Sequence, residues 1–341
     1  MAVVPDPQRR TRLIALAGLP AVVAAILCLS TGSTVVRKVG APGISIAFYR
    51  SLLATLIWQL ALLSRGRHLT WAGFKRSGPA GALFGFNIAA FFAGVTHTSI
   101  ANAEFIGTLT PLIVIPAGAL LFAETVPWRA LPWAGGALAG VALVLLNAPA
   151  SGRSSWSGNL LVVFAIGLWA TYLLVARQAR RDGGVDVVEF MATSSCVAAL
   201  VLFPVVAAQG RLDDIPRSGV PWLVLLTLVN GLAAHGLLVV AQRRVPVGTT
   251  SMLQVAQPAF AVLWAFLFLG ETIEPLQGVG MGVVVASLAV FTYAVSRTAP
   301  NATAGPAGPA GDDVGEVVGE VVGATTDSVR NAQGSSGEPP G

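Results

Sequence analysis

The sequence is divided into apolar blocks of about 20 residues, and the short stretches between the blocks hold nearly all of the Arg and Lys. A helix of that length spans the hydrocarbon core of a bilayer, which is about 30 Å thick. A hydropathy window of about 19 residues predicts ten blocks, at 13–36, 44–63, 78–96, 99–122, 128–147, 157–176, 187–208, 219–241, 247–269 and 275–296. The sequence therefore predicts an all-α integral membrane protein with ten transmembrane helices.

The composition argues against the common soluble classes. Only 11% of the residues are charged, against about 25% in a soluble domain. The pI of 9.9 does not indicate a nucleic-acid partner, because the basic residues lie at the ends of apolar blocks and form no patch. Cys28 and Cys196 lie inside apolar blocks, and the chain has no HExxH, CxxC or Gly-rich phosphate motif. We therefore expect no metal and no cofactor.

The positions of Arg and Lys predict the orientation of the helices. With the N-terminus inside, 14 basic residues fall on the cytoplasmic side and five fall outside. The inner set is Arg9, Arg10, Arg12, Arg65, Arg67, Lys75, Arg76, Arg129, Arg177, Arg180, Arg181, Arg243, Arg244 and Arg297; the outer set is Arg37, Lys38, Arg153, Arg211 and Arg217. Because cytoplasmic loops carry the excess of positive charge, both termini are predicted to lie on the cytoplasmic side of the cell membrane.

The chain contains an internal repeat. Residues 111–125 align with residues 258–272 without a gap, and each segment begins with Pro and ends with Glu-Thr before a Gly-rich block. The repeat predicts two five-helix units, 13–148 and 149–297. Because five is odd, the second unit enters the membrane upside down relative to the first. Inverted repeats of this kind place a substrate site near the midplane and permit alternating access.

Both ends of the chain lie outside the two units. Residues 1–12 are expected to form a cytoplasmic N-terminal segment. Residues 298–341 consist largely of Gly, Pro, Ala, Ser and acidic residues, which cannot bury enough apolar surface to order themselves. The composition predicts a disordered cytoplasmic tail.

These features resemble the drug/metabolite transporter superfamily and, within it, the EamA-like branch, over residues 13–296. The resemblance rests on the Pro followed thirteen residues later by Glu-Thr, on the aromatic stretch LWATY at 168–172, and on FYR at 48–50. The sequence departs from the family at Leu29, where Trp is usual, and at Glu104, where a small residue is common. The resemblance implies a transporter fold but no particular substrate, because the superfamily carries amino acids, purines, drugs, sugar phosphates and other metabolites.

Four ionisable residues lie within apolar blocks: Arg50, Glu104, Glu189 and His235. Such a residue costs at least about 2.5–3.5 kcal/mol in hydrocarbon on insertion scales, so it usually faces the bundle interior or a wet cavity. Glu189 lies two residues into its block and Arg177 lies just past the end of its own. Both are expected to extend to the membrane interface.

Arg50 and Glu104 lie at similar depths, about 9 Å and 7.5 Å from the outer ends of their blocks at 1.5 Å per residue. Arg50 either clamps helix ends or contacts an anionic group of the substrate. Glu104 either carries a proton, if apolar side chains surround it, or stays ionised by pairing with Arg50. The coincidence of depth permits the pair, which is strongly favoured if the two helix faces converge. Substrate could then compete for one of its members.

The remaining candidate residues are polar or aromatic side chains near the middle of the blocks. They are Asn87, Trp169, Tyr172, Asn230, His235, Gln254 and Gln257. Each alone is explained by helix packing or by a hydrogen bond between helices, and a buried neutral His bonded to a carbonyl is common. Together they favour a polar cavity with an aromatic wall. For His235 the sequence favours a buried neutral side chain bonded to a backbone carbonyl, and the alternative is a cavity-lining His whose protonation couples to transport.

Two prolines and two Gly-rich blocks complete the pattern. Pro111 and Pro258 occupy equivalent positions, and each is expected to kink its helix beside the cavity because Pro removes a backbone hydrogen bond. The Gly-rich fifth and tenth blocks allow close helix contact, and the sequence leaves open a homodimer through that face.

The sequence therefore predicts a secondary transporter that exports a small metabolite or drug by alternating access across the cytoplasmic membrane. Its expected partners are the lipid bilayer, the small-molecule substrate and, through Glu104 and His235, protons. The alternative is an intramembrane enzyme or a membrane sensor without transport. The chain lacks the paired carboxylates, metal ligands or Ser/His constellation that such an enzyme needs.

Overall fold

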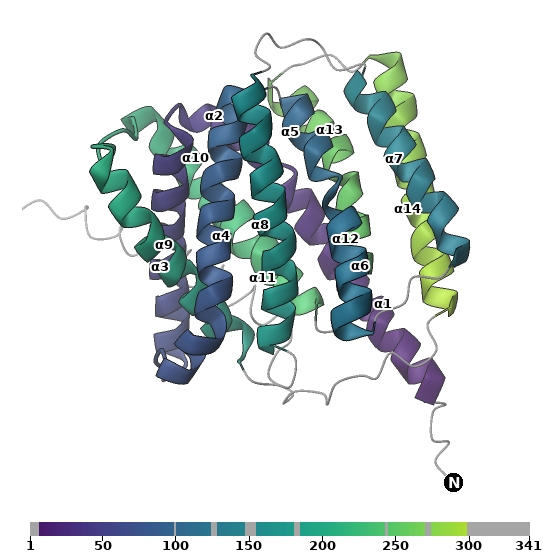
Figure 1. The fold of residues 1–341 in the computed structure, drawn as a ribbon, viewed down its shortest axis with the longest axis horizontal. Helices are drawn as coiled ribbons and strands as arrows, with labels where there is room; N and C mark the ends of the chain where they lie inside the picture. The colour runs from purple at the N-terminus through teal and green to yellow at the C-terminus, as the bar shows by residue number, and fades with distance from the viewer. Residues whose placement is uncertain are drawn as a thin grey trace, which may run out of the picture.

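The computed structural model describes residues 7–98, 100–123, 128–146, 155–180, 185–242, 245–269 and 274–298. All regular secondary structure in these ranges is helical (Figure 1). The helices are α1 (Pro7–Leu29), α2 (Gly32–Val39), α3 (Gly43–Ser64), α4 (Trp71–His97), α5 (Ile100–Gly107), α6 (Thr110–Phe122), η1 (Trp128–Ala130), α7 (Leu131–Leu146), α8 (Trp156–Arg180), α9 (Val187–Ala208), η2 (Arg217–Gly219), α10 (Val220–Leu225), η3 (Leu226–Ala234), α11 (His235–Ala241), α12 (Val247–Leu253), η4 (Gln254–Ala256), α13 (Gln257–Leu269) and α14 (Pro275–Thr298). The predicted tail beyond Thr298 and both Glu-Thr pairs lie outside the described residues.

Seven helical segments are long and apolar enough to cross a membrane. They are Gly18–Val39, Gly43–Ser64, Trp71–His97, Ala103–Phe122, Trp156–Arg180, Val187–Ala208 and Arg217–Ala241. These segments correspond to seven of the ten predicted blocks. The other three blocks correspond to α7, to α12–η4–α13 and to α14, whose part Pro275–Phe291 is a shorter apolar helix.

Several of the helical segments that correspond to the ten predicted blocks are interrupted near their middle. The first breaks between Leu29 and Gly32, the fourth breaks before Thr110, and η4 separates α12 from α13. Pro111 and Pro258 are each the second residue of the helix after the break. Pro is well tolerated there because the first turn of a helix has unbonded N–H groups in any case. These prolines begin new helices and do not bend continuous ones.

Three pairs of helices pack antiparallel with extensive contacts: α4 with α8, α3 with α9, and α7 with α14, which stand together at one side of the bundle (Figure 1). The contact of α4 with α9 is as extensive as that of α3 with α9, but there the two helices run in the same direction, since Gly73 lies against Glu189 and Gly85 against Ala198. Near the start of α3, Ser45 Oγ donates to the carbonyl of Arg211, which follows α9, at 3.3 Å. Near the start of α14, Gln277 Nε2 donates to the carbonyl of Val144 near the end of α7, at 3.4 Å.

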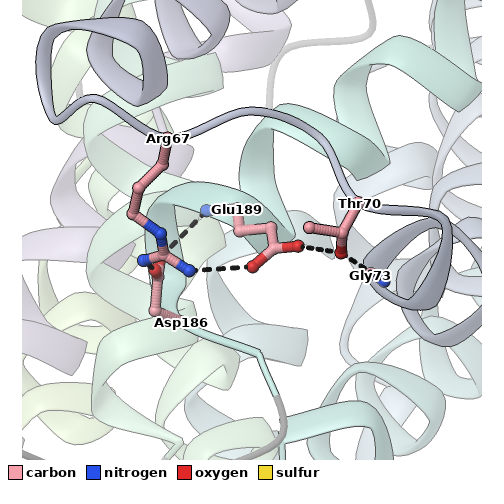
Figure 2. Close-up of polar contacts among 5 residues, drawn as sticks. All are labelled: Arg67, Thr70, Gly73, Asp186 and Glu189. Atoms are coloured by element: carbon pink, nitrogen blue, oxygen red, sulfur yellow. Dashed lines mark hydrogen bonds and ion pairs between the residues drawn. The ribbon is translucent and has the colours of Figure 1, made fainter.

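A polar cluster of Arg67, Thr70, Asp186 and Glu189 joins the end of α3 to the start of α9 (Figure 2). Arg67 forms ion pairs with both carboxylates, and the Arg67–Glu189 distance is 3.0 Å. Thr70 Oγ1 donates to Glu189 Oε1 at 2.7 Å and accepts from Gly73 N at the start of α4. Glu189 is buried and binds the α3–α4 connection. The expectation that it extends to the membrane interface stays a prediction.

Two arginines, each in the last turn of its helix, bind helix connections. Arg177, in the last turn of α8, donates to the carbonyls of Gln242 and Val245 at 3.1 Å each, and its guanidinium lies 5.3 Å from the ring centre of Phe122. Arg37, in the last turn of α2, donates to the carbonyl of Thr98 at 3.3 Å. Backbone carbonyls at the ends of neighbouring helices thus bind Arg177, and the expectation that it extends to the membrane interface stays a prediction.

Candidate functional site

A cavity of about 100 Å³, here called the central cavity, lies where the helix breaks meet. Its lining residues are Leu29, Gly32, Ser33, Asn87, Ile88, Phe91, Phe92, Ala103, Glu104, Gly107, Thr108, Thr110, Ile166, Trp169, Asn230, His235, Gln254, Gln257 and Pro258. They come from the α1–α2 and α5–α6 breaks, from α4 and α8, from the π-helix η3 with the start of α11, and from η4 with α13. Irregular backbone at membrane depth is tolerated where it is buried in protein or lines a cavity, and π-helical turns often occur at functional sites.

Most of the predicted site residues line this cavity. Seven do so: Asn87, Glu104, Trp169, Asn230, His235, Gln254 and Gln257. Pro258 also lines it, whereas Pro111 does not. Arg50 and Tyr172 do not line the central cavity, but each contacts a residue that does: Arg50 contacts Asn230, and Tyr172 contacts Trp169.

Glu104 is buried in the wall formed by the start of α5, with 4% of its surface exposed. Ser33 Oγ donates to Glu104 Oε1, and the side chain of Gln257 is a second hydrogen-bond partner. No ion pair joins Glu104 to Arg50, both of which are described residues, so the predicted pair is wrong. The two side chains have different partners, Ser33 for Glu104 and Asn230 for Arg50.

Arg50 fixes the break between α1 and α2 through Asn230. It is 1% exposed, and its Nη2 donates to Asn230 Oδ1 at 3.0 Å. Asn230 Nδ2 in turn donates to the carbonyl of Leu29, the last residue of α1, at 3.1 Å. A Cβ at Gly32 would lie 2.8 Å from Asn230 Nδ2, so the next helix begins with the one residue that allows this approach. The Arg50 guanidinium also lies 5.5 Å from the ring centre of Phe84.

His235 is oriented by a backbone carbonyl. Its Nδ1 lies 2.5 Å from the carbonyl oxygen of Asn230 and 3.4 Å from Arg50 Nη2. Because a carbonyl only accepts, this geometry assigns the proton to Nδ1, and the contact with Arg50 is then not a hydrogen bond. The Nε2 atom is left as an acceptor.

Aromatic rings form one side of the site. Trp169 stacks on Tyr172 with ring centres 5.2 Å apart, and the His235 ring stands edge-on to Trp169 at 5.7 Å. Trp169 Nε1 donates to Gln254 Oε1 at 3.2 Å, which links α8 to η4 across the cavity wall. One turn earlier in α8, Asn87 Nδ2 donates to the carbonyl of Ala165 at 2.7 Å. Asn87 and Gln254 therefore both join helices and line the cavity.

Sequence reasoning missed several polar lining residues, namely Ser33, Thr108 and Thr110. Ser33 belongs to the run STGST at 30–34, a cluster of small polar residues inside the first apolar block. Such a run favours a helix break, because Ser and Thr side chains bond nearby backbone groups. Here Ser30 and Thr31 bond the carbonyls of Leu27 and Cys28, each three residues back.

The described residues contain no cluster of three or more His, Cys, Asp or Glu side chains that could hold a metal ion. The polar groups of the residues that line the central cavity are amides, hydroxyls, one imidazole, one indole N–H and one carboxylate. This set suits hydrogen bonding to a small polar molecule.

Comparisons with known proteins agree with the transporter interpretation. A model of the EamA-like transporter family matches residues 16–146 and again residues 156–293. The threonine/homoserine exporter RhtA of Escherichia coli (strain K12) is 28% identical over 141 residues, which are 41% of this chain and 47% of RhtA. The match thus spans about half the length of that relative.

A second relative and a solved structure cover more of the chain. The pseudopaline exporter CntI of Pseudomonas aeruginosa (strain UCBPP-PA14) is 26% identical over 289 residues, 82% of this chain and 96% of CntI. A crystal structure of a protein at 21% identity aligns over 82% of this chain and 98% of its own, with a TM-score of 0.66. That likeness shows a shared fold.

Proposed function

The chain belongs to the EamA-like transporter family, and from this premise we propose that it exports a small polar metabolite by alternating access between two inverted halves. It is a multi-pass membrane protein, and its family is one of transporters, not enzymes. The observation that carries the proposal is the central cavity, in which helix breaks and polar side chains of both halves meet. We accordingly propose no catalytic role for these residues.

The inverted repeat is supported by three features. The family model matches the chain twice, once in each proposed unit, 13–148 and 149–297. The equivalent helices α3 and α9, and likewise α7 and α14, pack antiparallel, as inversion requires. Arg37 and Arg177 bind the corresponding connections of their own units. In this proposal α7, α12–η4–α13 and α14 complete ten spans, with both termini inside.

With that orientation, the central cavity belongs to an outward-facing state. Its polar residues Ser33 and Glu104 come from the outer end of the first span and the start of the fourth. The inner ends are held by the Arg67 cluster and by Arg177. Export requires these inner contacts to open while the outer half closes, which the pseudo-symmetry of the two units permits.

The lining chemistry supports a substrate of amino-acid size with several hydrogen-bonding groups. Asn87, Gln254, Gln257 and the Nε2 of His235 offer amide and imidazole partners, and Trp169 offers an apolar face. Two relatives are named as exporters of threonine/homoserine and of pseudopaline. We therefore propose amino acids and their polar derivatives as the substrate class, with threonine as the first probe.

We propose Glu104 as the proton carrier. It has no cation partner among the described residues, and an ionised carboxylate is costly to bury alone. His235 is less suited, because Arg50 Nη2 lies 3.4 Å from its Nδ1 and a second positive charge there would be repelled. In this scheme a proton exchanges at Glu104 as substrate leaves the cavity.

Flux through the purified protein in proteoliposomes tests the proposed function. Vesicles loaded with unlabelled threonine, homoserine or other amino acids should accumulate the labelled compound by counterflow, whereas empty liposomes should not. The double variant Gln254→Ala/Gln257→Ala should lose most of this flux, because it removes two polar groups of the cavity. Leu60→Ala, at a 65% exposed position on α3, is the matched control and should keep it. Absence of counterflow across the whole amino-acid panel in folded protein would contradict the proposed substrate class.

A further inference from the structure

The ionisable side chains of the central cavity offer a partner to a cation but not to an anion. Among the described residues that line the cavity, Glu104 is the one acidic side chain and none is Arg or Lys. Arg50 is 1% exposed, is not a lining residue and donates to Asn230. The wall can therefore meet a positively charged group directly, but it has no cationic side chain to offer to a negatively charged one.

Glu104 is held in position by neutral partners from both proposed units. Ser33 Oγ, in α2, donates to Glu104 Oε1, and the side chain of Gln257, in α13, is the second partner. An ionised carboxylate has about four acceptor sites, so two hydrogen bonds leave capacity for a ligand. Neutral hydrogen bonds orient the group but do not compensate its charge, and a buried charge is normally paired. The carboxylate is thus prepared for an incoming cation.

The hydroxyl and imidazole groups of the lining add neutral acceptors. Thr108 Oγ1, one helical turn after Glu104, donates to the carbonyl of Phe105 at 2.6 Å. Thr110 Oγ1 donates to the carbonyl of Gly107 at 2.8 Å. Because each hydroxyl hydrogen is used in this way, the oxygen is left to accept, as is the Nε2 atom of the His235 ring. A carboxylate together with neutral acceptors suits an ammonium group, which has three N–H donors and a positive charge.

Building on the proposed transport function, we propose that Glu104 binds the protonated amino group of the substrate and that the cavity does not require a carboxylate at the other end of the molecule. The substrate class is then small primary amines, which include amino alcohols as well as amino acids. At about 10–15 Å³ for each water-sized group, the volume of about 100 Å³ has room for roughly seven to ten such groups, the size of threonine or of its amino alcohol. Proton exchange at Glu104 is compatible with this role, because the carboxylate loses its ammonium partner when the substrate leaves.

Thermal unfolding of the purified protein distinguishes recognition of the amino group from recognition of the carboxylate. The probes are threonine, threoninol, which lacks the carboxylate, and 3-hydroxybutyrate, which lacks the amino group, at neutral pH and at equal ionic strength made up with potassium chloride. Threonine and threoninol should each raise Tm along a saturable curve, with half-saturating concentrations within about threefold of each other. 3-Hydroxybutyrate should not raise Tm, because a site that bonds an N–H group rejects the analogue that lacks it. Sodium chloride in place of potassium chloride should not raise it either.

Variants of Glu104 test whether its charge is responsible. Glu104→Gln keeps the shape of the side chain and removes the charge, so it should raise the half-saturating threoninol concentration at least about tenfold, which is about 1.4 kcal/mol of binding free energy. Glu104→Asp keeps the carboxylate and should keep the preference for threoninol over 3-hydroxybutyrate. The control is Trp156→Phe, at a 78% exposed position, which should leave the curves unchanged.

Five results would each overturn the proposal: equal rises of Tm with 3-hydroxybutyrate and threoninol, a rise with sodium equal to that with threoninol, a rise with threonine but not with threoninol, no rise with either amine, or a threoninol curve unchanged in Glu104→Gln. Counterflow separates this proposal from the proposed function. Threonine counterflow together with any of these results would leave export standing and remove the amine site. Amine binding that depends on Glu104 without any counterflow would do the reverse.

Discussion

Replacing Glu104 by Gln is expected to lower export by roughly tenfold or more, a loss of about 1.4 kcal/mol of transition-state stabilisation. The substitution keeps the shape of the side chain and its contacts with Ser33 and Gln257, but the amide cannot gain or release a proton. The remaining flux should no longer respond to an imposed pH gradient. Flux into proteoliposomes, measured with and without that gradient, gives the result.

The matched control for this variant is Ser33→Ala. It removes the hydrogen bond to Glu104 and leaves the carboxyl group, so flux should fall less than in Glu104→Gln and should keep its response to the pH gradient. If Glu104→Gln transports with an unchanged response to the gradient, Glu104 is not the proton carrier.

Replacing Arg50 by Ala is expected to impair transport strongly although Arg50 does not line the central cavity. Its Nη2 holds Asn230, which in turn bonds the carbonyl at the end of α1. Without Arg50 the wall around this helix break loses its support. Asn230→Ala should have a similar effect, and the double variant should be little worse than either single one. The expected coupling between the two is about 0.5–3 kcal/mol, the range for residues in direct contact.

A double-mutant cycle that combines Arg50→Ala with Glu104→Gln supplies the comparison. The effects of Arg50→Ala and Glu104→Gln should multiply, because no ion pair joins the two residues. Tm of each purified variant must be measured alongside flux, to separate loss of function from loss of the fold. Strong coupling between Arg50 and Glu104, together with independence of Arg50 and Asn230, would contradict this arrangement.

Much of the site could be predicted because polar residues are conspicuous in apolar blocks. Placing a lone amide or carboxyl group in hydrocarbon is costly, so such side chains must face inward and meet there. This reasoning located Asn87, Glu104, Asn230, His235 and Gln254, all of which line the central cavity. What these residues do in transport stays a prediction.

The incorrect predictions have a different physical origin. Depth along the membrane normal follows from position in a block, but the direction in which a side chain points does not, because these helices are apolar on most faces. Arg50 and Glu104 were matched in depth, yet they face Asn230 and Ser33 respectively. The tertiary partners of a side chain could not be predicted either. Glu189, for example, is bound by Arg67 and Thr70, which lie more than 100 positions earlier in the chain.

Two-sided accessibility of Thr108 tests alternating access to the cavity between the two halves. This residue lines the central cavity and is 4% exposed. In a variant with Cys28 and Cys196 replaced by Ala, Thr108→Cys is treated with a membrane-impermeant thiol reagent in right-side-out and in inside-out vesicles. Cysteines at Gly152 and Gly183, predicted to lie outside and inside, report the sidedness.

With alternating access, Thr108→Cys should be modified from both sides, faster from the outside, and saturating substrate should change the ratio of the two rates. The control cysteines should each react from one side, and from opposite sides. Modification of Thr108→Cys from one side alone under every condition would contradict alternating access and favour a fixed cavity, as in a sensor.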